Sequence, residues 1–321
     1  SLGKFNLNGY RDTSNLPPGN NITYSPYLKL FISGYSSPFY NSTTNTANGV
    51  AISYDGKSWT VSIIPFVSSS TVGSWGISYW SSELNCFLLG NTSTFSSADN
   101  YHRILRSTDG ITWTSVLRNE GYKIAITGFT WIKKYKMLLT NNYYYTYDGV
   151  TWYRDTTLSS SITYSSLQDK FVSTSAVTNG TSSYYLDEIN LFIILTSNNS
   201  LSISTNGSNW KSYTTPAVFN NLVWVKELGT ILFTTSTASS SPIYICNLYT
   251  SNINLSYFNS NTITNYKNNS VNNWYIKNTP SNTWKSIVYS IDLNLFVAIS
   301  NSGTNNRIMT SNDGWNLISR T

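Results

Sequence analysis

A seven-residue motif, Ser/Thr-x-Asp-Gly-x-x-Trp, returns along this 321-residue chain and restricts its fold more than any other feature. Its copies occupy residues 53–59, 107–113, 146–152, 204–210 and 311–317. In the fourth copy Asn206 replaces Asp, and in the last copy Leu317 stands in the Trp position. A motif that recurs at long, uneven intervals indicates one supersecondary unit used several times.

Each copy has the pattern of a β-hairpin. The residues before the Asp-Gly pair alternate between apolar and polar, which predicts a strand, and the Trp falls on the strand that follows. Gly adopts positive φ without a steric penalty, and the Asp carboxylate accepts hydrogen bonds from nearby backbone N–H groups. We therefore expect structural turns at Asp55, Gly56, Asp109, Gly110, Asp148, Gly149, Asn206, Gly207, Asp313 and Gly314.

A second pattern precedes the turn. An aromatic residue is followed seven positions later by a bulky apolar residue, with a predicted turn between them. The pairs are Tyr24/Phe31, Trp80/Phe87, Trp131/Leu138, Tyr164/Phe171, Tyr185/Phe192, Trp224/Ile231 and Tyr289/Phe296. Together the two patterns predict a unit of four short strands.

A four-stranded sheet of this kind has to bury its Trp against a neighbouring sheet, and a closed ring of such sheets does this for every unit. The sequence therefore predicts an all-β chain with a single β-propeller domain over residues 1–321. The motif's Trp positions, with Trp274 in a degenerate copy as the fifth and Leu317 as the sixth, indicate six four-stranded antiparallel blades. The aromatic pairs number seven, so seven blades is the alternative, with the surplus in residues 153–182. The segment 1–20 includes a stretch, 5–11, that resembles the last strand and is expected to close the ring with the last blade.

Composition excludes several functions. The net charge of +6 is modest, and no basic stripe with interleaved aromatic residues predicts nucleic-acid binding. No run of apolar residues is long enough for a membrane helix, so no membrane insertion is expected. The two cysteines, Cys86 and Cys246, are predicted to be buried free thiols. The densest basic cluster, at residues 133–136, is expected to be a solvated turn, with an anionic contact as the alternative.

No catalytic residue, metal site or cofactor is predicted. His102 is the only histidine, and two lone cysteines cannot form a zinc site. The turn aspartates recur in blade after blade, whereas a catalytic group is needed once, so their repetition indicates a structural role. The other acidic residues are scattered, and no spacing singles out a pair.

A few aromatic and charged residues are expected on the face where the chain enters each blade. Trp75 and Trp284 each lie five residues before an aromatic pair, and Phe219 holds the same place before Trp224. An aromatic ring near an arginine and amide side chains is typical of sugar binding. The candidate ligand-binding residues are Trp75, Tyr101, His102, Arg103, Phe219, Trp284 and Arg307. The alternative is that Trp75 and Trp284 cap the core at the blade entrance.

The last repeat, residues 278–314, resembles the tandem β-propeller repeats of structural proteins from large DNA viruses and phages, and the copies at 21–60, 75–114 and 126–153 resemble them too. The turn is also similar to the Asp-box of sialidases and to propellers of the photosystem assembly factor type, but it differs from the Asp-box in having Gly directly after Asp. Sialidases also need an arginine triad and a Tyr/Glu nucleophile pair, and this chain has no recognisable catalytic acid motif.

The resemblance implies a non-enzymatic binding module on a virion or tail surface that recognises a glycan or a host receptor. A secreted or cell-surface location is the alternative. One alternative is a structural virion component that contacts neighbouring capsid proteins. The other is a sialidase-like glycoside hydrolase, which requires two carboxylates within about 10 Å of each other in the central pocket.

Overall fold

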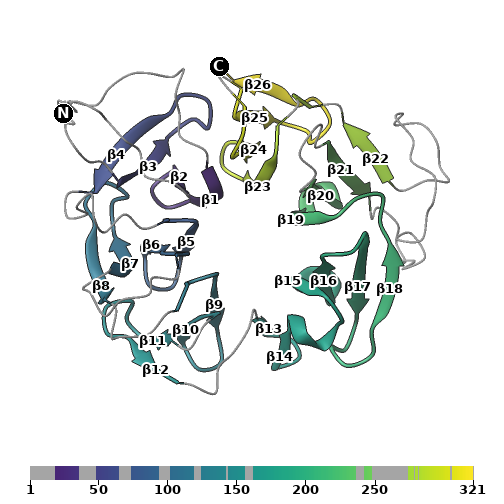
Figure 1. The fold of residues 1–321 in the computed structure, drawn as a ribbon, viewed down its shortest axis with the longest axis horizontal. Helices are drawn as coiled ribbons and strands as arrows, with labels where there is room; N and C mark the ends of the chain where they lie inside the picture. The colour runs from purple at the N-terminus through teal and green to yellow at the C-terminus, as the bar shows by residue number, and fades with distance from the viewer. Residues whose placement is uncertain are drawn as a thin grey trace.

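Short antiparallel strands form seven sheets arranged in a ring in the computed structural model of this chain (Figure 1). The structure describes residues 19–35, 48–64, 74–93, 102–118, 124–141, 144–155, 162–235, 242–247, 274–277, 279–280, 282–303 and 306–320. Among these residues, six sheets have four strands and one has two. The prediction of an all-β propeller with six four-stranded blades is therefore confirmed.

We number the blades in chain order. Blade 1 has β1 (Gly19–Ser25), β2 (Leu30–Tyr35), β3 (Asn48–Ser53) and β4 (Thr60–Ile64), and blade 2 has β5 (Ile77–Ser81), β6 (Cys86–Gly90), β7 (His102–Ser107) and β8 (Thr114–Arg118). Blade 3 has β9 (Phe129–Ile132), β10 (Met137–Thr140), β11 (Tyr144–Thr146) and β12 (Tyr153–Arg154). Blade 4 has β15 (Gly180–Leu186), β16 (Leu191–Thr196), β17 (Ser200–Ser204) and β18 (Lys211–Thr214). Blade 5 has β19 (Phe219–Val225), β20 (Thr230–Thr235), β21 (Ile243–Asn247) and β22 (Trp274–Lys277), and blade 6 has β23 (Trp284–Ser290), β24 (Leu295–Ser300), β25 (Ile308–Ser311) and β26 (Ile318–Arg320).

The two-stranded sheet, β13 (Ile162–Ser165) and β14 (Lys170–Ser173), occupies its own position in the ring between blades 3 and 4 (Figure 1). We call it the short sector. On one side the Thr130 hydroxyl donates to the Ile162 carbonyl at 2.8 Å, and on the other the Gln168 amide donates to the Thr205 carbonyl at 2.6 Å. The surplus aromatic pair of the sequence thus forms an inner hairpin, which has no outer strands among the described residues.

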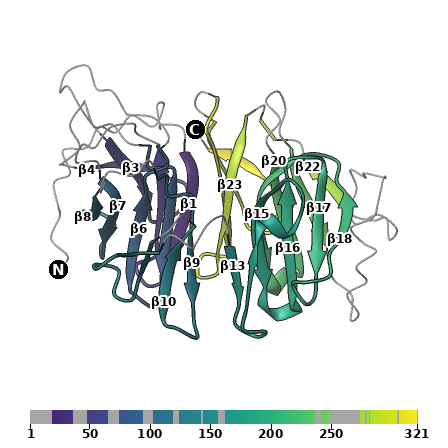
Figure 2. The ribbon, with the colours of Figure 1, turned by 60° about the horizontal axis from the view of Figure 1, so that its bottom comes forward.

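Seven inner hairpins share one geometry. All seven aromatic pairs predicted from the sequence are direct cross-strand partners, as in Tyr24↔Phe31 and Tyr164↔Phe171. In each hairpin the last turn residue has a left-handed backbone, with φ between 46° and 59°; these residues are Lys29, Asn85, Lys136, Asp169, Asn190, Gly229 and Asn294. In Figure 2 the turns that follow β9 and β13 lie on the lower side of the ring. We call the ring surface formed by these turns the inner-turn face.

The hydrophobic core lies between the sheets. Trp59 packs with Leu295 and Val297 of blade 6, and Trp113 packs with Leu30 and Ile32 of blade 1. Trp152 packs against the hydrophobic cluster between blades 2 and 3, and Trp210 packs against the cluster between the short sector and blade 4; both remain partly exposed. The motif tryptophans therefore shield neighbouring sheets from water, as expected from the sequence.

The ring closes by contact of blade 1 with blade 6. β1 lies against β23, and the Tyr24 hydroxyl donates to Asp292 at 3.2 Å. The C-terminal strand β26 completes blade 6 by pairing with β25. The predicted closing strand at residues 5–11 lies outside the described residues.

Candidate functional site

The Asp-Gly turns form one repeated hydrogen-bond pattern. In blade 2, Asp109 Oδ1 accepts from the backbone N–H groups of Ile111 (2.8 Å) and Thr112 (2.7 Å), and the Ser107 hydroxyl donates to it at 2.9 Å. The same three contacts occur in blades 1, 3 and 6, and Asn206 makes them in blade 4. These contacts show that the Asp or Asn side chain has a structural role in every blade where they occur.

Each turn glycine also packs against the preceding sheet. Gly110 has φ +76°, and a Cβ at this position would lie 2.5 Å from Leu30 Cδ2 of blade 1. Gly56 would meet Leu295 of blade 6 at 2.8 Å, and Gly207 would meet Val172 of the short sector at 2.7 Å. The turns therefore join neighbouring sheets, and the short sector takes the place of a blade in this series.

The turn geometry lowers the pKa of the aspartates. At Asp148 the N–H groups of Thr151 and Val150 bring the carboxyl pKa to about 2. At Asp313 partial burial opposes the shift, but the N–H groups of Asn316 and Trp315 outweigh it, and the pKa is again about 2. A carboxylate held ionised by backbone donors is a stable acceptor and a poor general acid.

Three of the aromatic residues predicted to meet a ligand are buried. The exposed fractions of the side chains are 1% for Trp75, 3% for Phe219 and 0% for Trp284. Phe219 stacks on Phe233 with ring centroids 4.5 Å apart, and Trp284 Nε1 donates to the Pro280 carbonyl at 3.3 Å. A ring that stacks on a sugar needs an open face. The burial therefore favours the capping role over a ligand role for these residues.

The two predicted arginines bind their own blades. The Arg103 guanidinium donates to the Ser93 carbonyl at 2.8 Å, and Arg307 donates to the Gly303 carbonyl at 2.6 Å. Both hold the loop between the second and third strands of their blades, so the two arginines occupy equivalent positions. Arg103 is fully buried, which removes it from any open ligand surface. His102 begins β7 and its carbonyl accepts from Asn91 at 3.1 Å, while Tyr101 lies outside the described residues.

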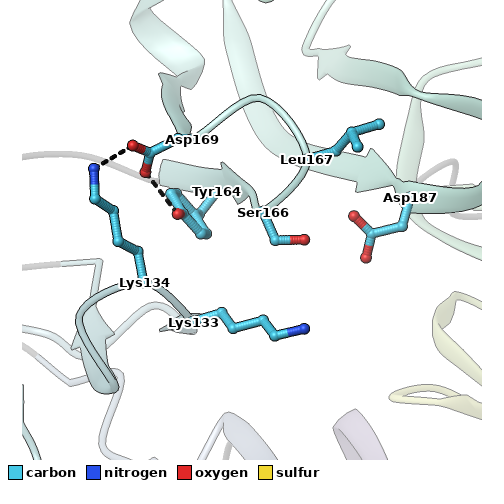
Figure 3. A pocket seen from close by; sticks show the side chains of 7 residues that line it. All are labelled: Lys133, Lys134, Tyr164, Ser166, Leu167, Asp169 and Asp187. Carbon is cyan, nitrogen blue, oxygen red and sulfur yellow. Dashed lines mark hydrogen bonds and ion pairs between the residues drawn. The ribbon is translucent and has the colours of Figure 1, made fainter.

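A pocket of about 680 Å³ opens on the inner-turn face, at the turns of blade 3, the short sector and blade 4. Its lining residues are Lys133, Lys134, Tyr164, Ser166, Leu167, Asp169 and Asp187. Figure 3 shows Lys133 extending into the open space, with Ser166 and Asp187 on the opposite side. The pocket therefore brings together side chains from three neighbouring sectors of the ring.

One wall of the pocket is fixed by a chain of contacts. Lys134 forms an ion pair with Asp169, and the Tyr164 hydroxyl donates to the other Asp169 oxygen at 2.8 Å (Figure 3). The bond to Lys134, followed by the bond from Tyr164, lowers the pKa of Asp169. This carboxylate therefore stays ionised and in place.

The opposite wall has different electrostatics. Burial and then the nearby Glu188 raise the pKa of Asp187, while Lys133 and Ser166 oppose the shift. Ser166 and Leu167 are exposed at the turn between β13 and β14. The pocket thus offers ammonium donors, carboxylate acceptors, a hydroxyl and apolar surface in one place.

Only part of this pocket is predictable from the sequence. The basic cluster at residues 133–136 is recognisable in the sequence. No local pattern marks Asp187 and Ser166, because they lie near this cluster only when the ring brings three inner turns together. The surplus pair Tyr164/Phe171 is the sequence signal for the short sector, which supplies part of the pocket lining. Among the described residues no group of three or more His, Cys, Asp or Glu side chains could hold a metal ion. Within the same residues, no helix has the length and apolarity to cross a membrane.

Comparisons with known proteins identify the fold. No protein-family description matches the chain, and no curated protein matches it. Among solved structures, the chain is similar to one in the crystal structure of the mitotic checkpoint complex, with a TM-score of 0.54 and 10% identity over 94% of this chain and 96% of that one. It also aligns with the Dos1 propeller, with a TM-score of 0.43 and 10% identity over 95% of this chain and 71% of that one. At 10% sequence identity, the similarity to the chain of the mitotic checkpoint complex shows the fold alone. Together with the six four-stranded blades, it establishes that this chain is a β-propeller.

Proposed function

We propose that this protein is a non-enzymatic binding module of a virion or phage tail surface, and that its inner-turn pocket binds a glycan of the host. The observation that supports a binding role is the convergence of Lys133, Ser166 and Asp187 around one opening. Convergent polar groups beside apolar surface are the usual composition of a ligand site.

The chemistry of the pocket fits a sugar better than an anion. A sugar presents hydroxyl groups, which pair with ammonium, hydroxyl and carboxylate groups, and C–H faces, which pack on apolar surface such as Leu167. A phosphate would meet the carboxylates of Asp169 and Asp187 in the same pocket. Two carboxylates offset the two lysines, so the alternative of an anionic contact at residues 133–136 is disfavoured.

Glycoside hydrolysis is the second candidate, and one observation favours it. Asp169 and Asp187 line the same pocket and their pKa values shift in opposite directions, as an acid and base pair requires. The fold, however, explains Asp169. The Tyr164–Asp169 bond recurs as Tyr185–Asn190 at 2.8 Å and Tyr289–Asn294 at 2.6 Å, which is the behaviour of a turn device. We therefore prefer binding without turnover.

A glycan array followed by titration calorimetry tests the proposal. We expect one class of glycan to bind, and Lys133→Ala and Asp187→Ala each to weaken binding by about tenfold, since each removes a charged hydrogen-bonding partner. Lys57→Ala is the matched control, because Lys57 is an exposed lysine in a turn of blade 1, outside the pocket.

Three results would redirect the proposal. An array without hits would favour the structural virion component, whose contacts are with neighbouring capsid proteins. Release of free sugar from the bound glycan, lost in Asp187→Asn, would establish the hydrolase. Antibodies against the folded propeller should label intact particles, and labelling only after disruption would contradict the surface location.

A further inference from the structure

Phe171 of the short sector is exposed, in contrast to every equivalent residue of the ring. Its side chain is 41% exposed. The equivalent residues in the blades are 0–1% exposed: Phe31, Phe87, Leu138, Phe192, Ile231 and Phe296. The ring of Phe171 contacts Tyr164 of β13 with centroids 5.0 Å apart, which is the same inner contact that the blades make. The difference therefore arises on the outer side of β14.

In every blade a third strand pairs with the second strand at this level. The residue opposite is Ser53, Ser107, Thr146, Ser204, Cys246 or Ser311. Among the described residues, β14 pairs with β13 alone. An edge of this kind is a template for a further strand.

The adjoining chain is too short to supply the missing strands. In blade 4 the third and fourth strands with their turn occupy Ser200–Thr214. The short sector is separated from β12 by seven residues, 155–161, and from β15 by six, 174–179. Residues 174–179 are described, and they form the 3₁₀ helix η3 (Thr174–Ala176) and a turn.

Blade 3 turns an aromatic surface toward this sector. Tyr144 packs in the cluster between blades 2 and 3, so its strand neighbour Tyr145 points to the opposite face of the sheet. Tyr145 stacks on Tyr153 with centroids 5.3 Å apart, and Tyr147 meets both rings. Tyr147 and Tyr153 are exposed by 53% and 46%. We call these three residues the tyrosine surface.

We propose that a β-strand of a partner protein pairs with β14 and completes the short sector. Blades 1 to 4 define its chemistry: apolar residues followed by Ser or Thr opposite Phe171, then a tight turn, and an aromatic residue six positions after the Ser or Thr. In the blades that aromatic residue covers the equivalent ring, as Trp59 covers Phe31 (6.3 Å) and Trp210 covers Phe192 (6.5 Å). The incoming strand would lie between β14 and the tyrosine surface.

A second copy of this chain is the less suitable occupant. Figure 1 shows β14 nearer the ring centre than β12 and β18 of the neighbouring blades. Two rings therefore meet at those outer strands before their β14 edges come together. A single strand with its following turn, supplied by another protein, has the narrow shape that this position admits.

A peptide taken from the chain itself is the probe. Residues 199–214 hold the third strand, turn and Trp of blade 4. We expect the fluorescent peptide to bind the wild-type protein, to protect the β14 amides from hydrogen exchange, and to bind Phe171→Lys about tenfold more weakly. Ile318→Lys replaces an exposed apolar residue of blade 6 and is the matched control. Circular dichroism and melting curves establish that both variants are folded.

Two outcomes would overturn the inference. One is no saturable binding, or binding that Phe171→Lys and Ile318→Lys reduce alike. The other is a dimer of the wild-type protein that Phe171→Lys dissociates, which would assign the edge to a second copy. The site is separate from the glycan proposal, because Lys133→Ala should leave peptide binding unchanged while reducing glycan binding.

Discussion

Tyr289 donates a hydrogen bond of 2.6 Å to the side chain of Asn294, the left-handed residue of its own turn. Tyr185 and Asn190 repeat this bond, and Asp169 takes the place of Asn in the short sector. Asn tolerates left-handed backbone better than other non-glycine residues, and it also accepts the hydrogen bond. The turn therefore has a residue preference that the chain satisfies in some sectors and not in others.

Lys136 is a position where this preference is not met. It has φ +47° and an exposed side chain at the turn of blade 3. We expect Lys136→Asn to raise the free energy of unfolding by about 0.5 kcal/mol, since left-handed backbone costs less for Asn. Denaturant unfolding measures the change. Lys133→Asn in the same turn is the control, and an equal gain there would show that charge and not backbone conformation is responsible.

Gly110→Ala tests the contact between neighbouring sheets. The added Cβ would lie 2.5 Å from Leu30, and φ +76° is strained for alanine. We expect a loss of about 3 kcal/mol, combining strain and overpacking. Gly149→Ala has a similar φ of +73° but its nearest neighbour is at 3.3 Å, so about 1 kcal/mol is expected. Similar losses in the two variants would contradict the packing argument.

The turn aspartates predict acid sensitivity. Their folded pKa lies below the unfolded value near 4, as at Asp148 and Asp313 with about 2. The stabilisation is therefore present above pH 4 and is lost as the pH falls toward 2. Melting temperatures measured from pH 7 to pH 2 should fall steeply in this window. The variant with both residues changed to Asn should show a shallower fall, and an unchanged slope would contradict this assignment.

Asp148→Ala and Asp148→Asn separate the acceptor from the charge. Asn206 shows that an amide makes the same turn, with contacts of 3.0 and 2.9 Å to the next N–H groups. We expect Asp148→Ala to lose about 1 kcal/mol of unfolding free energy, as for other side-chain caps, and Asp148→Asn to lose much less at neutral pH. Chemical denaturation of both variants tests this, and equal losses would assign the effect to charge.

The cysteines provide a probe of the intact ring. Cys86 and Cys246 are fully buried free thiols, as predicted from the sequence, and burial raises the pKa of Cys246 to about 12. Thiolate is the reactive form, so both should resist a disulfide reagent at pH 8 until the protein unfolds. The rate of thiol labelling in increasing urea should follow the loss of circular dichroism. Rapid labelling of the native protein would indicate local opening of blades 2 or 5.

The sequence predicted the fold in detail because each blade repeats its own local chemistry. Asp109-Gly110 specifies a turn within a few residues, and Tyr164 and Phe171 are spaced for a cross-strand pair. The candidate site was harder to predict from the sequence than the fold. Trp75 and Trp284 lie at blade entrances, where exposure and burial have the same sequence pattern, and only packing against neighbouring strands decides between them. The pocket depends on residues from three sectors, whose proximity follows from ring closure and has no local sequence signal.

Blades 1 and 6 meet without exchanging a strand among the described residues, since β1–β4 and β23–β26 each form a complete sheet. The contact between these blades depends on side chains such as Trp59 and Leu295, and on the Tyr24–Asp292 and Asn301–Asn20 hydrogen bonds. When two neighbouring blades separate, the hydrogen bonds within each sheet remain intact. Separation of blade 1 from blade 6 is therefore the deformation of the ring that requires the least free energy. A mechanical force applied at the ends of β1 and β26 should accordingly open the ring between blades 1 and 6 first and unfold the individual sheets only at higher force.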